Sequence, residues 1–354
     1  MKIASIVGAR PNFVKLAPVS REIRKNLDEV IIHTEQHYDY EMDRIFFQEL
    51  GIPDPDYHLG IGSGSHGRQT GDMLKGIEEI LLKESPDIAL VFGDTNTTLA
   101  GALAASKLHI PVAHVEAGLR SFNKKMPEEV NRVLVDHCSE FLFCPTKTAV
   151  ENLCKECIVD GVSLTGDVML DILQECITIA EKSSKILEEL ELRPKEYYLA
   201  TVHRAENTDD PERLKNIVDA LCSIEDVVFP CHPRTRKRLE DLHLWDRVKE
   251  SLQVINPVGY LDMLLLEKNA CKILTDSGGV QKEAYMLQTP CITMRDETEW
   301  VETIEDGWNL LVGSDKKTII EAAHGFEPAS MPRNIFGSGN AGQRIVETMV
   351  SQPE

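Results

Sequence analysis

The sequence predicts a two-domain α/β protein in which each domain holds a doubly wound parallel sheet. First, its 354 residues exceed the roughly 100–200 residues expected of one domain. Second, short apolar runs alternate with helical runs almost from the first residue, and strands separated by helices form parallel βαβ units. Third, the alternation stops in a long, charged, helical stretch near residues 165–195 and then starts again. Two α/β halves joined in that stretch follow from this pattern.

The first half opens with an apolar strand and continues in alternation. Its expected strands are residues 2–7, 30–34, 88–92, 111–115 and 141–144, and its expected helices are residues 13–25, 39–50, 97–107 and 128–138. A helical region at about 168–190 precedes the second half. There the expected strands are residues 197–202, 227–230, 252–255, 272–275 and 291–294, and the expected helices are residues 210–224 and 280–287. Ligands in such sheets bind outside the carboxyl ends of the strands, so the residues that follow each strand are the functional candidates.

The composition excludes several classes of function. The contents of 42% hydrophobic and 27% charged residues are those of a soluble globular protein. The net charge of −20 argues against a nucleic-acid partner, which would need a clustered basic face, although a few local cations can still bind an anionic small ligand. No apolar run reaches the ~18–20 residues that span a bilayer, and Arg10 interrupts the apolar N-terminus. We therefore expect no membrane insertion and a cytoplasmic protein.

Two patterns that could indicate a metal or a dinucleotide lack the necessary context. Nine cysteines, an odd number in a chain without a targeting signal, favour free thiols over a disulfide framework. Cys154 and Cys157 have CxxC spacing, but no second pair completes four zinc ligands. Gly62-Ser63-Gly64-Ser65-His66-Gly67 matches GxGxxG without following a convincing strand, so we interpret it as a mobile loop. We expect no metal and no cofactor.

Three carboxylates of the first half stand where a strand ends or a helix begins. Asp94 follows the strand at 88–92 and either begins a turn before a threonine-capped or asparagine-capped helix or faces a ligand. Glu116 directly follows the apolar strand at 111–115 and is harder to explain as a structural residue. Glu128 begins a helix four residues before Arg132, a favourable pair that gives it a structural role of its own.

Cationic residues stand near other strand ends. In the first half, Arg10 lies in the turn before a helix that carries Lys15. The N–H groups at a helix start and these two cations attract anions, although an ordinary βα turn has a similar sequence. In the second half one strand leads to His203-Arg204, and another to His232-Pro233-Arg234. Two strands that each end in a histidine near an arginine suggest an anion pocket.

The segment LTDSGGVQKEA, residues 274–284, predicts a diphosphate cradle. A strand ends at Thr275, and the run Ser277-Gly278-Gly279 allows the backbone to approach a ligand closely. The helix that begins near Val280 adds N–H donors at its N-terminus. Glu283 lies about one turn into this helix, where its carboxylate can accept hydrogen bonds from ribose hydroxyls. The segment is not a Walker loop because the GK[ST] ending is missing.

Taken in order, these segments resemble the non-hydrolysing UDP-N-acetylglucosamine 2-epimerases. The matching stretches span residues 8–299 and are GARPNFVKLAPV, VFGDTNTTLAG, HVEAGLRS, MPEEVNR, TVHRAEN, CHPRTR, TDSGGVQKEA and MRDETE, with GNAGQRI further on. The resemblance implies a glycosyltransferase-B architecture in which two Rossmann-like domains, 1–166 and 167–339, face a cleft. It also implies that a last helix within 340–354 crosses back onto the first domain and that the protein forms a homodimer.

The same resemblance implies the reaction and the residues that perform it. The reaction is the reversible interconversion of UDP-GlcNAc and UDP-ManNAc, which in this family commonly feeds polysaccharide or glycan synthesis. By position in the motifs, the catalytic residues are Asp94, Glu116, Glu128 and His203. The nucleotide is held by Arg10, Lys15, His232, Ser277, Gly278, Gly279 and Glu283. The structural interpretation of Glu128 yields to this match, although a role at the helix start can coexist with it.

Some positions depart from the family pattern. Trp300 stands where many bacterial members have an arginine, so one cationic contact is missing or replaced. Ala205 stands where some members carry a second arginine. The segment 36–40, QHYDY, differs from the arginine-containing version of bacterial enzymes that their own substrate activates, which puts regulation of that kind in doubt.

Four alternatives stay open at this point. A hydrolysing 2-epimerase would release ManNAc and UDP, and a related epimerase would prefer another UDP-2-acetamido sugar, such as a diacetamido uronic acid. A retaining glycosyltransferase would share the fold and the cradle but would require an acceptor. A non-catalytic sensor would bind the sugar nucleotide without turnover.

Overall fold

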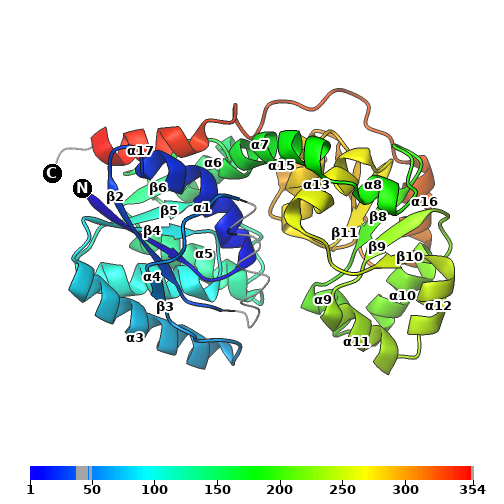
Figure 1. Cartoon of the computed structure of the whole chain (residues 1–354), viewed down its shortest axis with the longest axis horizontal. Helices are drawn as coiled ribbons and strands as arrows, with labels where there is room; N and C mark the ends of the chain where they lie inside the picture. Colours follow the sequence, from blue (N-terminus) through cyan, green and yellow to red (C-terminus); the bar gives the residue numbers. More distant parts are fainter. Residues whose placement is uncertain (37–46, 48–49, 352–354) are drawn as a thin grey trace. The chain divides into compact units, whose positions relative to one another are not determined.

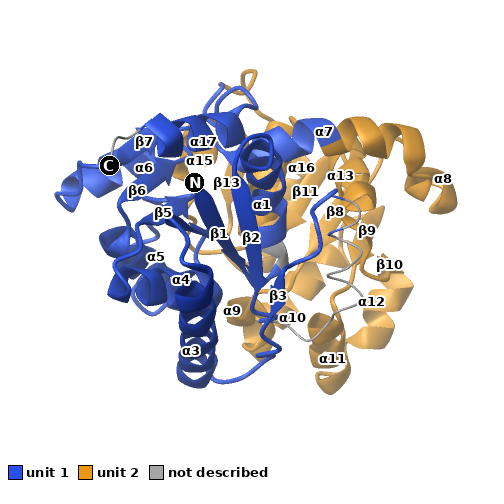
Figure 2. Cartoon of the chain, turned by 60° about the vertical axis from the view of Figure 1, so that its left-hand side comes forward, with its two compact units in different colours: residues 1–175, 334–354 blue, residues 176–333 orange. Residues whose placement is uncertain are grey.

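A computed structural model of the whole chain describes residues 1–36, 47 and 50–351, with the side chains of residues 10 and 11 left out. The chain forms two compact units. Unit 1 comprises residues 1–175 and 334–354, and unit 2 comprises residues 176–333. Figure 2 distinguishes the two units by colour. Each unit is built around its own parallel sheet, as the alternation of strands and helices predicts.

Unit 1 contains a seven-stranded parallel sheet with the strand order β3-β2-β1-β4-β5-β6-β7. The strands are β1 (Lys2–Val7), β2 (Asp28–His33), β3 (Tyr57–His58), β4 (Ile88–Phe92), β5 (Val112–Val115), β6 (Phe141–Cys144) and β7 (Val162–Leu164). Its helices are α1 (Arg10–Ile23), α3 (His66–Glu84), α4 (Asn96–Lys107), α5 (Pro127–Cys138), α6 (Lys147–Lys155) and α17 (Ala341–Ser351). Helix α7 (Val168–Ser183) begins in unit 1 and ends in unit 2.

Helices cover both faces of this sheet, which explains the apolar strand sequences. Helices α3, α4 and α5 lie on one face, whereas α1 and α17 lie on the other (Figure 1). Every residue of β4, with the sequence IALVF, is buried, as expected of a parallel strand that is covered on both sides. Helix α17 packs on α1, because Gly342 lies against the backbone of Pro18. The Gly342 N–H group also donates a hydrogen bond to Asp171 at 2.8 Å.

Unit 2 contains a six-stranded parallel sheet with the order β10-β9-β8-β11-β12-β13. The strands are β8 (Tyr198–Thr201), β9 (Val227–Pro230), β10 (Gln253–Ile255), β11 (Lys272–Thr275), β12 (Cys291–Thr293) and β13 (Asn309–Leu311). The helices are α8 (Ile186–Glu189), α9 (Ala205–Thr208), α10 (Pro211–Leu221), α11 (Pro233–Asp241), α12 (Trp245–Ser251), α13 (Tyr260–Asn269), α14 (Gly278–Met286), α15 (Val301–Glu305) and α16 (Lys316–Gly325). One apolar core joins the sheet to α10 and α16. The other joins it to α13 and α14.

Both sheets reverse their strand order at one point. In unit 1 the first strand, β1, lies between β2 and β4, and in unit 2 the first strand, β8, lies between β9 and β11. The carboxyl ends of strands at such a switch point are where open α/β sheets bind ligands. The turns after β1 and β4, and those after β8 and β11, are therefore the places to look for a site.

Some elements of the structure are not predicted by the sequence pattern. The edge strands β3 and β7 of unit 1 and β13 of unit 2 are short, at two or three residues each. The 19-residue helix α3 was also missed, and His66 and Gly67 of the GxGxxG pattern are its first two residues. Only residues 62–65 form the expected loop, which connects a short strand to a helix at the sheet edge. The expected helix 39–50 lies outside the described residues except for Phe47 and Leu50.

The structure bears on two further expectations. All nine cysteines are free thiols, and Cys154 and Cys157 are both exposed, the first of them on α6. In the part of the chain that the structure describes, no helix is long and apolar enough to cross a membrane. The segment 36–40 lies outside the described residues apart from Gln36.

Candidate active site

Asp94 and Glu116 lie at the carboxyl ends of adjacent strands. Strands β4 and β5 pair so that Phe92 faces Val115, which places the two following turns side by side. Glu116 comes directly after β5, and its N–H group and that of Ala117 both donate to the Phe143 carbonyl at 3.1 Å. Its φ of 76° is a left-handed conformation that strains a residue with a side chain. The turn therefore fixes the carboxylate at a defined place.

The Glu116 carboxylate is paired with Lys15. The lysine projects from α1, and the two buried side chains form an ion pair. An adjacent cation favours the charged form of a carboxylate. Two residues that the sequence analysis assigned separately, one to catalysis and one to the nucleotide, are thus in contact in unit 1. Arg10 is the first residue of the same helix, but its side chain lies outside the described part.

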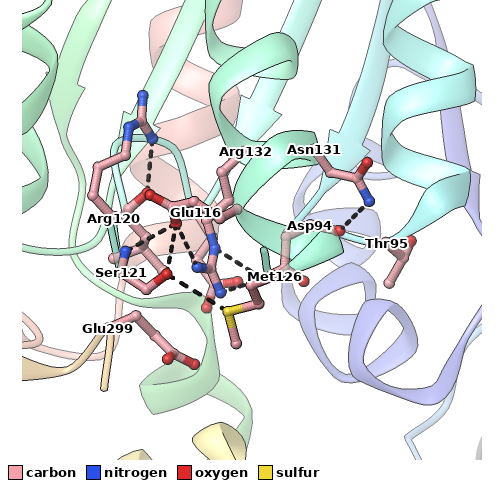
Figure 3. A network of polar contacts seen from close by, with 12 residues as sticks. Asp94, Thr95, Glu116, Arg120, Ser121, Met126, Asn131, Arg132 and Glu299 are labelled. Carbon is pink, nitrogen blue, oxygen red and sulfur yellow. Dashed lines mark hydrogen bonds and ion pairs between the residues drawn. The ribbon is translucent and has the colours of Figure 1, made fainter. Parts of the chain in front are cut away.

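Helix α5 holds Asp94 in place. The Nε and Nη2 atoms of Arg132 lie 3.0 and 2.6 Å from one carboxylate oxygen of Asp94. The side-chain amide of Asn131 donates to the Asp94 carbonyl at 2.8 Å. Figure 3 shows Arg132 and Asn131 reaching Asp94 from this helix. The predicted capping of the next helix is also present, because the Thr95 hydroxyl accepts from the Thr98 N–H at 3.4 Å.

The partner of Arg132 within α5 is Glu129, so the predicted pair between Glu128 and Arg132 is wrong. Arg132 Nη1 lies 3.0 Å from Glu129, three residues earlier. Glu128 is half-buried in the first turn of α5 and forms no ion pair with a described residue. Pro127-Glu128-Glu129 offers two carboxylates in one turn, and the helix register turns the second one inward.

Glu129 is a structural residue that the sequence analysis missed. It accepts hydrogen bonds from the N–H groups of Ser121 and Phe122 at 2.9 and 2.8 Å. Burial alone would raise the pKa of Glu129, but these two N–H groups and Arg132 outweigh it and lower the pKa. Glu129 therefore stays ionised and connects the loop after β5 to the arginine that holds Asp94.

A buried charge network lies beneath the turns that carry Asp94 and Glu116. Asp136 accepts hydrogen bonds from His114 Nδ1 at 2.7 Å, from Arg120 at 2.7 Å and from the Gly118 N–H at 3.1 Å. The other ring nitrogen of His114 lies 2.8 Å from the Gly93 carbonyl. Both ring nitrogens of His114 thus face an oxygen atom. The network thus ties the turn after β4 to the turn after β5.

The glycine in this turn predicts a measurable loss of stability. Gly118 has a φ of 80°, and a Cβ atom there would meet the Ala149 carbonyl oxygen at 2.4 Å. Replacing Gly118 by alanine is expected to lower the free energy of unfolding by about 2 kcal/mol, because the backbone is strained and must move. Urea denaturation followed by circular dichroism measures this change.

Gly71 is the matched control for Gly118. It lies inside α3, where an added Cβ atom would meet nothing within 4 Å. Alanine at position 71 is expected to stabilise the helix slightly. Equal effects of alanine at both positions would contradict the role of the Gly118 turn.

In unit 2, Asp276 anchors the segment that contains His203. Asp276 is fully buried at the end of β11. Its carboxylate accepts from the N–H groups of His203 at 3.1 Å and Arg204 at 3.0 Å, and from Asn207 at 3.1 Å. No role was predicted for Asp276, because it stands inside the glycine-rich segment next to Ser277. It fixes the loop after β8 against the end of β11.

His203 and His232 lie close together, as the repeated strand ends suggest. Their ring centroids are 6.3 Å apart. Removal of water lowers the pKa of His203 below its ordinary value, and Arg204 and Arg234 act in the same direction against Asp276. His232 caps α11 by accepting the Arg234 N–H at 3.2 Å. The guanidinium of Arg234 pairs with Asp209 at 2.6 Å, so this arginine is engaged within the protein.

The segment that was predicted to bind a diphosphate forms the start of α14. Ser277 is the residue before the helix, and its hydroxyl accepts the Val280 N–H at 3.4 Å. Gly278 and Gly279 are the first two helical residues, and a Cβ atom on Gly278 would meet a carboxylate oxygen of Glu299 at 2.5 Å. Glu283 is buried one turn further along the helix. Backbone N–H groups at such a helix start are suited to a diphosphate.

Trp300, which departs from the family pattern, has a cation beside it. The tryptophan is buried, and the ammonium of Lys282 lies 4.2 Å from its ring centroid. A cation over an aromatic face is attracted by the ring. The positive charge next to Trp300 is thus supplied by α14.

One group of side chains in unit 1 has the composition of a metal site. The ligand atoms of His33, Glu35 and His58 lie within 4.8 Å of one another. In the structure His58 Nδ1 lies 3.0 Å from Glu35, so these two groups satisfy each other. Burial, followed by the charge of His58, lowers the pKa of His33 to about 4.

Comparison with known proteins places this arrangement in a family. A family model described as UDP-N-acetylglucosamine 2-epimerase matches residues 21–350. A protein of Methanococcus maripaludis named UDP-N-acetylglucosamine 2-epimerase homolog is 62% identical over 354 residues, which is 99% of each chain. A protein of Pseudomonas aeruginosa named UDP-2,3-diacetamido-2,3-dideoxy-D-glucuronate 2-epimerase is 50% identical over 363 residues, or 98% of this chain and 99% of its own.

The structural likeness is equally extensive. The crystal structure of Methanocaldococcus jannaschii UDP-GlcNAc 2-epimerase in complex with UDP-GlcNAc and UDP matches with a TM-score of 0.93 and 50% identity, covering 99% of this chain and 100% of that one. This likeness confirms the predicted fold class, two Rossmann-like α/β domains of the glycosyltransferase-B type. On these grounds the chain belongs to the UDP-N-acetylglucosamine 2-epimerase family.

Proposed function

We propose that the chain interconverts UDP-GlcNAc and UDP-ManNAc without releasing the free sugar. The observation that carries the proposal is the pair of carboxylates at the ends of β4 and β5, each joined to a cation: Asp94 to Arg132 and Glu116 to Lys15. Relatives that match nearly the whole chain are named for 2-epimerisation. We assign the chemistry at the sugar to unit 1 and the binding of the nucleotide chiefly to the α14 cradle of unit 2.

The chemistry requires a leaving group and groups that move protons. The C2 proton of the sugar is barely acidic until the C1–O bond to UDP weakens. Donors that stabilise the departing diphosphate allow positive charge to develop at C1, and this charge acidifies the C2 proton so that a carboxylate can remove it. Elimination yields 2-acetamidoglucal and UDP. Protonation of C2 from the opposite face, with return of UDP to C1, gives the epimer.

The residues of the site fit these roles. Glu116 is paired with Lys15 and so remains the charged form that a base requires. Asp94 and Glu128 are the further carboxylates that a two-face proton exchange needs. His203, whose pKa is lowered, is neutral at neutral pH and presents a donor and an acceptor. Ser277, Gly278 and Gly279 bind the diphosphate together with Arg10, Lys15 and His232, whereas Glu283 accepts from the ribose hydroxyls.

Proton NMR of the purified protein with UDP-GlcNAc in D2O tests the proposal. Without added metal, NAD or acceptor, we expect a UDP-ManNAc anomeric signal and deuterium at C2 of the product, because the proton removed from C2 exchanges with solvent. Free ManNAc and accumulating UDP would instead identify a hydrolysing enzyme. An unchanged spectrum with demonstrable UDP binding would exclude this sugar or this reaction.

A second substrate is favoured by one relative. The Pseudomonas aeruginosa protein named for UDP-2,3-diacetamido-2,3-dideoxy-D-glucuronate is 50% identical over nearly the whole chain. The elimination mechanism is the same for that sugar, so the carboxylates do not discriminate between the two. Parallel incubation with both UDP-sugars, followed by NMR, decides which one the protein turns over faster.

The oligomeric state and the cellular location of the protein are also proposed. We assign it to the cytoplasm, as a homodimer that acts without a metal or a cofactor and without a nucleic-acid partner. Light scattering of the purified protein gives its mass in solution and tests the dimer. Activity that persists after treatment with a chelator tests the independence from metal.

A further inference from the structure

Unit 2 buries a carboxylate to which neither the fold nor the reaction assigns a role. Glu267 on α13 is fully buried, and both of its carboxylate oxygens are shielded from solvent. Within the described chain it forms no ion pair with a lysine, arginine or histidine. Lys268, the next residue, pairs with Glu181 instead. An ionised carboxylate in such surroundings is very unfavourable.

The carboxylate that Glu267 faces is Glu283. Tyr260 and Glu267 are seven residues apart on α13, which is two helical turns, so they lie on the same face of that helix. Both side chains lie close enough to Glu283 on α14 for its charge to act on them, and the Glu267 oxygens have no other hydrogen-bond partner in the described chain. The carboxylate assigned to the ribose thus has two side chains of α13 behind it.

The other titratable groups near this pair offer no compensating cation. Helix α14 also carries Lys282, but its ammonium lies over the Trp300 ring, and Glu188 and Glu189 of α8 are exposed. Tyr197 and Cys291 interact with Glu267 from the sheet side, and Cys176 of α7 interacts with Tyr260. These three side chains are phenol or thiol groups and supply no positive charge. Burial, followed by repulsion from Glu283, raises the pKa of Glu267 well above its ordinary value.

The pair of Glu267 and Glu283 therefore holds one proton, and this proton is bound to Glu267, the more deeply buried of the two. Two adjacent carboxylates cannot both ionise in a dry environment. Glu267 is 0% exposed, whereas Glu283 is 7% exposed. A protonated carboxyl group has one O–H donor, and a hydrogen bond from it to a carboxylate is of the strong, charge-assisted kind.

We propose that Glu267 is a positioning residue that, as a neutral acid, donates a hydrogen bond to Glu283 and holds it as an anionic acceptor for the ribose of a uridine nucleotide. The inference rests on the proposed function, in which Glu283 binds the ribose. This hydrogen bond keeps Glu283 charged and fixed, so that its remaining acceptor capacity faces the two ribose hydroxyls.

The proposal implies a pH dependence with a definite sign. As the pH rises through the pKa of Glu267, the shared proton leaves and two adjacent anions repel each other. Glu283 is then displaced, and the affinity for UDP falls on the alkaline side. Below that range the proton is in place and the affinity is at its maximum with respect to this group.

The test is calorimetric titration of the full-length protein with UDP and with 2′-deoxy-UDP from about pH 6 to about pH 9.5. Glu267→Met keeps the side-chain volume but has no donor, so it is expected to bind UDP about tenfold more weakly and to discriminate less between the two nucleotides. Glu267→Gln keeps a donor and cannot ionise, so it is expected to bind UDP nearly as tightly as the unchanged protein. Its affinity should also lack the alkaline decline that the unchanged protein shows.

Two outcomes would overturn the inference. One is a methionine variant with unchanged UDP affinity and discrimination, and the other is a glutamine variant that keeps the alkaline decline. Glu283→Gln, measured in parallel, separates this failure from that of the proposed function. If it discriminates like the unchanged protein, Glu283 does not bind the ribose and the site assignment itself fails. Thermal melting of each variant shows whether the fold is retained.

Discussion

Glu116→Gln is expected to lower the rate of epimerisation by about 10²- to 10⁴-fold, the usual contribution of a general base, while UDP still binds. Glutamine has nearly the size and shape of glutamate but cannot accept a proton at neutral pH. The residue lies directly after β5 and is paired with Lys15, so the substitution removes the charge and leaves the turn in place. The rate is followed by NMR, and UDP binding is followed by calorimetry.

Glu151 provides the matched control for this variant. It is an exposed residue of α6 in the same unit, and Glu151→Gln changes the net charge of the protein by the same amount. The control is expected to keep full activity. Retained activity of Glu116→Gln would remove the catalytic role of this residue, and loss of UDP binding together with turnover would indicate damage to the fold.

Asp136→Asn is expected to lower the free energy of unfolding of unit 1 by about 3–5 kcal/mol, the usual cost of removing one partner of a buried ion pair. Asp136 accepts from His114, Arg120 and the Gly118 N–H. Burial raises its pKa, but His114 and Arg120 outweigh this effect and lower it. Asparagine has one acceptor oxygen, and its NH2 group would face another donor. Urea denaturation followed by circular dichroism measures the loss.

Glu156→Gln is the control for this network. Glu156 accepts a hydrogen bond from Arg120 Nε at 2.7 Å, and the Glu156 side chain is 27% exposed. A partly solvated pair contributes less, so the expected cost is at most about 1 kcal/mol. Equal losses of unfolding free energy in the two variants would show that the burial of Asp136 does not explain its contribution to stability.

The sequence predicts the two α/β units well because their central strands are continuous apolar runs. Residues placed directly after such strands, including Asp94, Glu116 and His203, could be located from the end of the run alone. The edge strands β3, β7 and β13 were missed because two or three residues give no periodicity. Helix α3 begins inside a glycine-rich pattern that is typical of a loop, which hides its start.

Residues that act through a partner were harder to predict. Glu128 and Glu129 are adjacent, and only the register of α5 turns Glu129 toward Arg132. Asp276 stands within a segment dominated by glycine and serine, where an aspartate is expected to cap a turn. It instead binds a loop about 70 residues earlier. Such long-range contacts depend on how the strands are ordered in the sheet, which no local pattern contains.

The left-handed backbone of Glu116 has a consequence for engineering the protein. At a φ of 76° glycine would be unstrained, whereas glutamate is strained. Replacing Glu116 by glycine would therefore remove backbone strain at this position. In the proposed function Glu116 is the base, so stability and activity oppose each other at position 116. A selection for heat resistance that ignores turnover would tend to discard this carboxylate, and a selection for turnover would keep it.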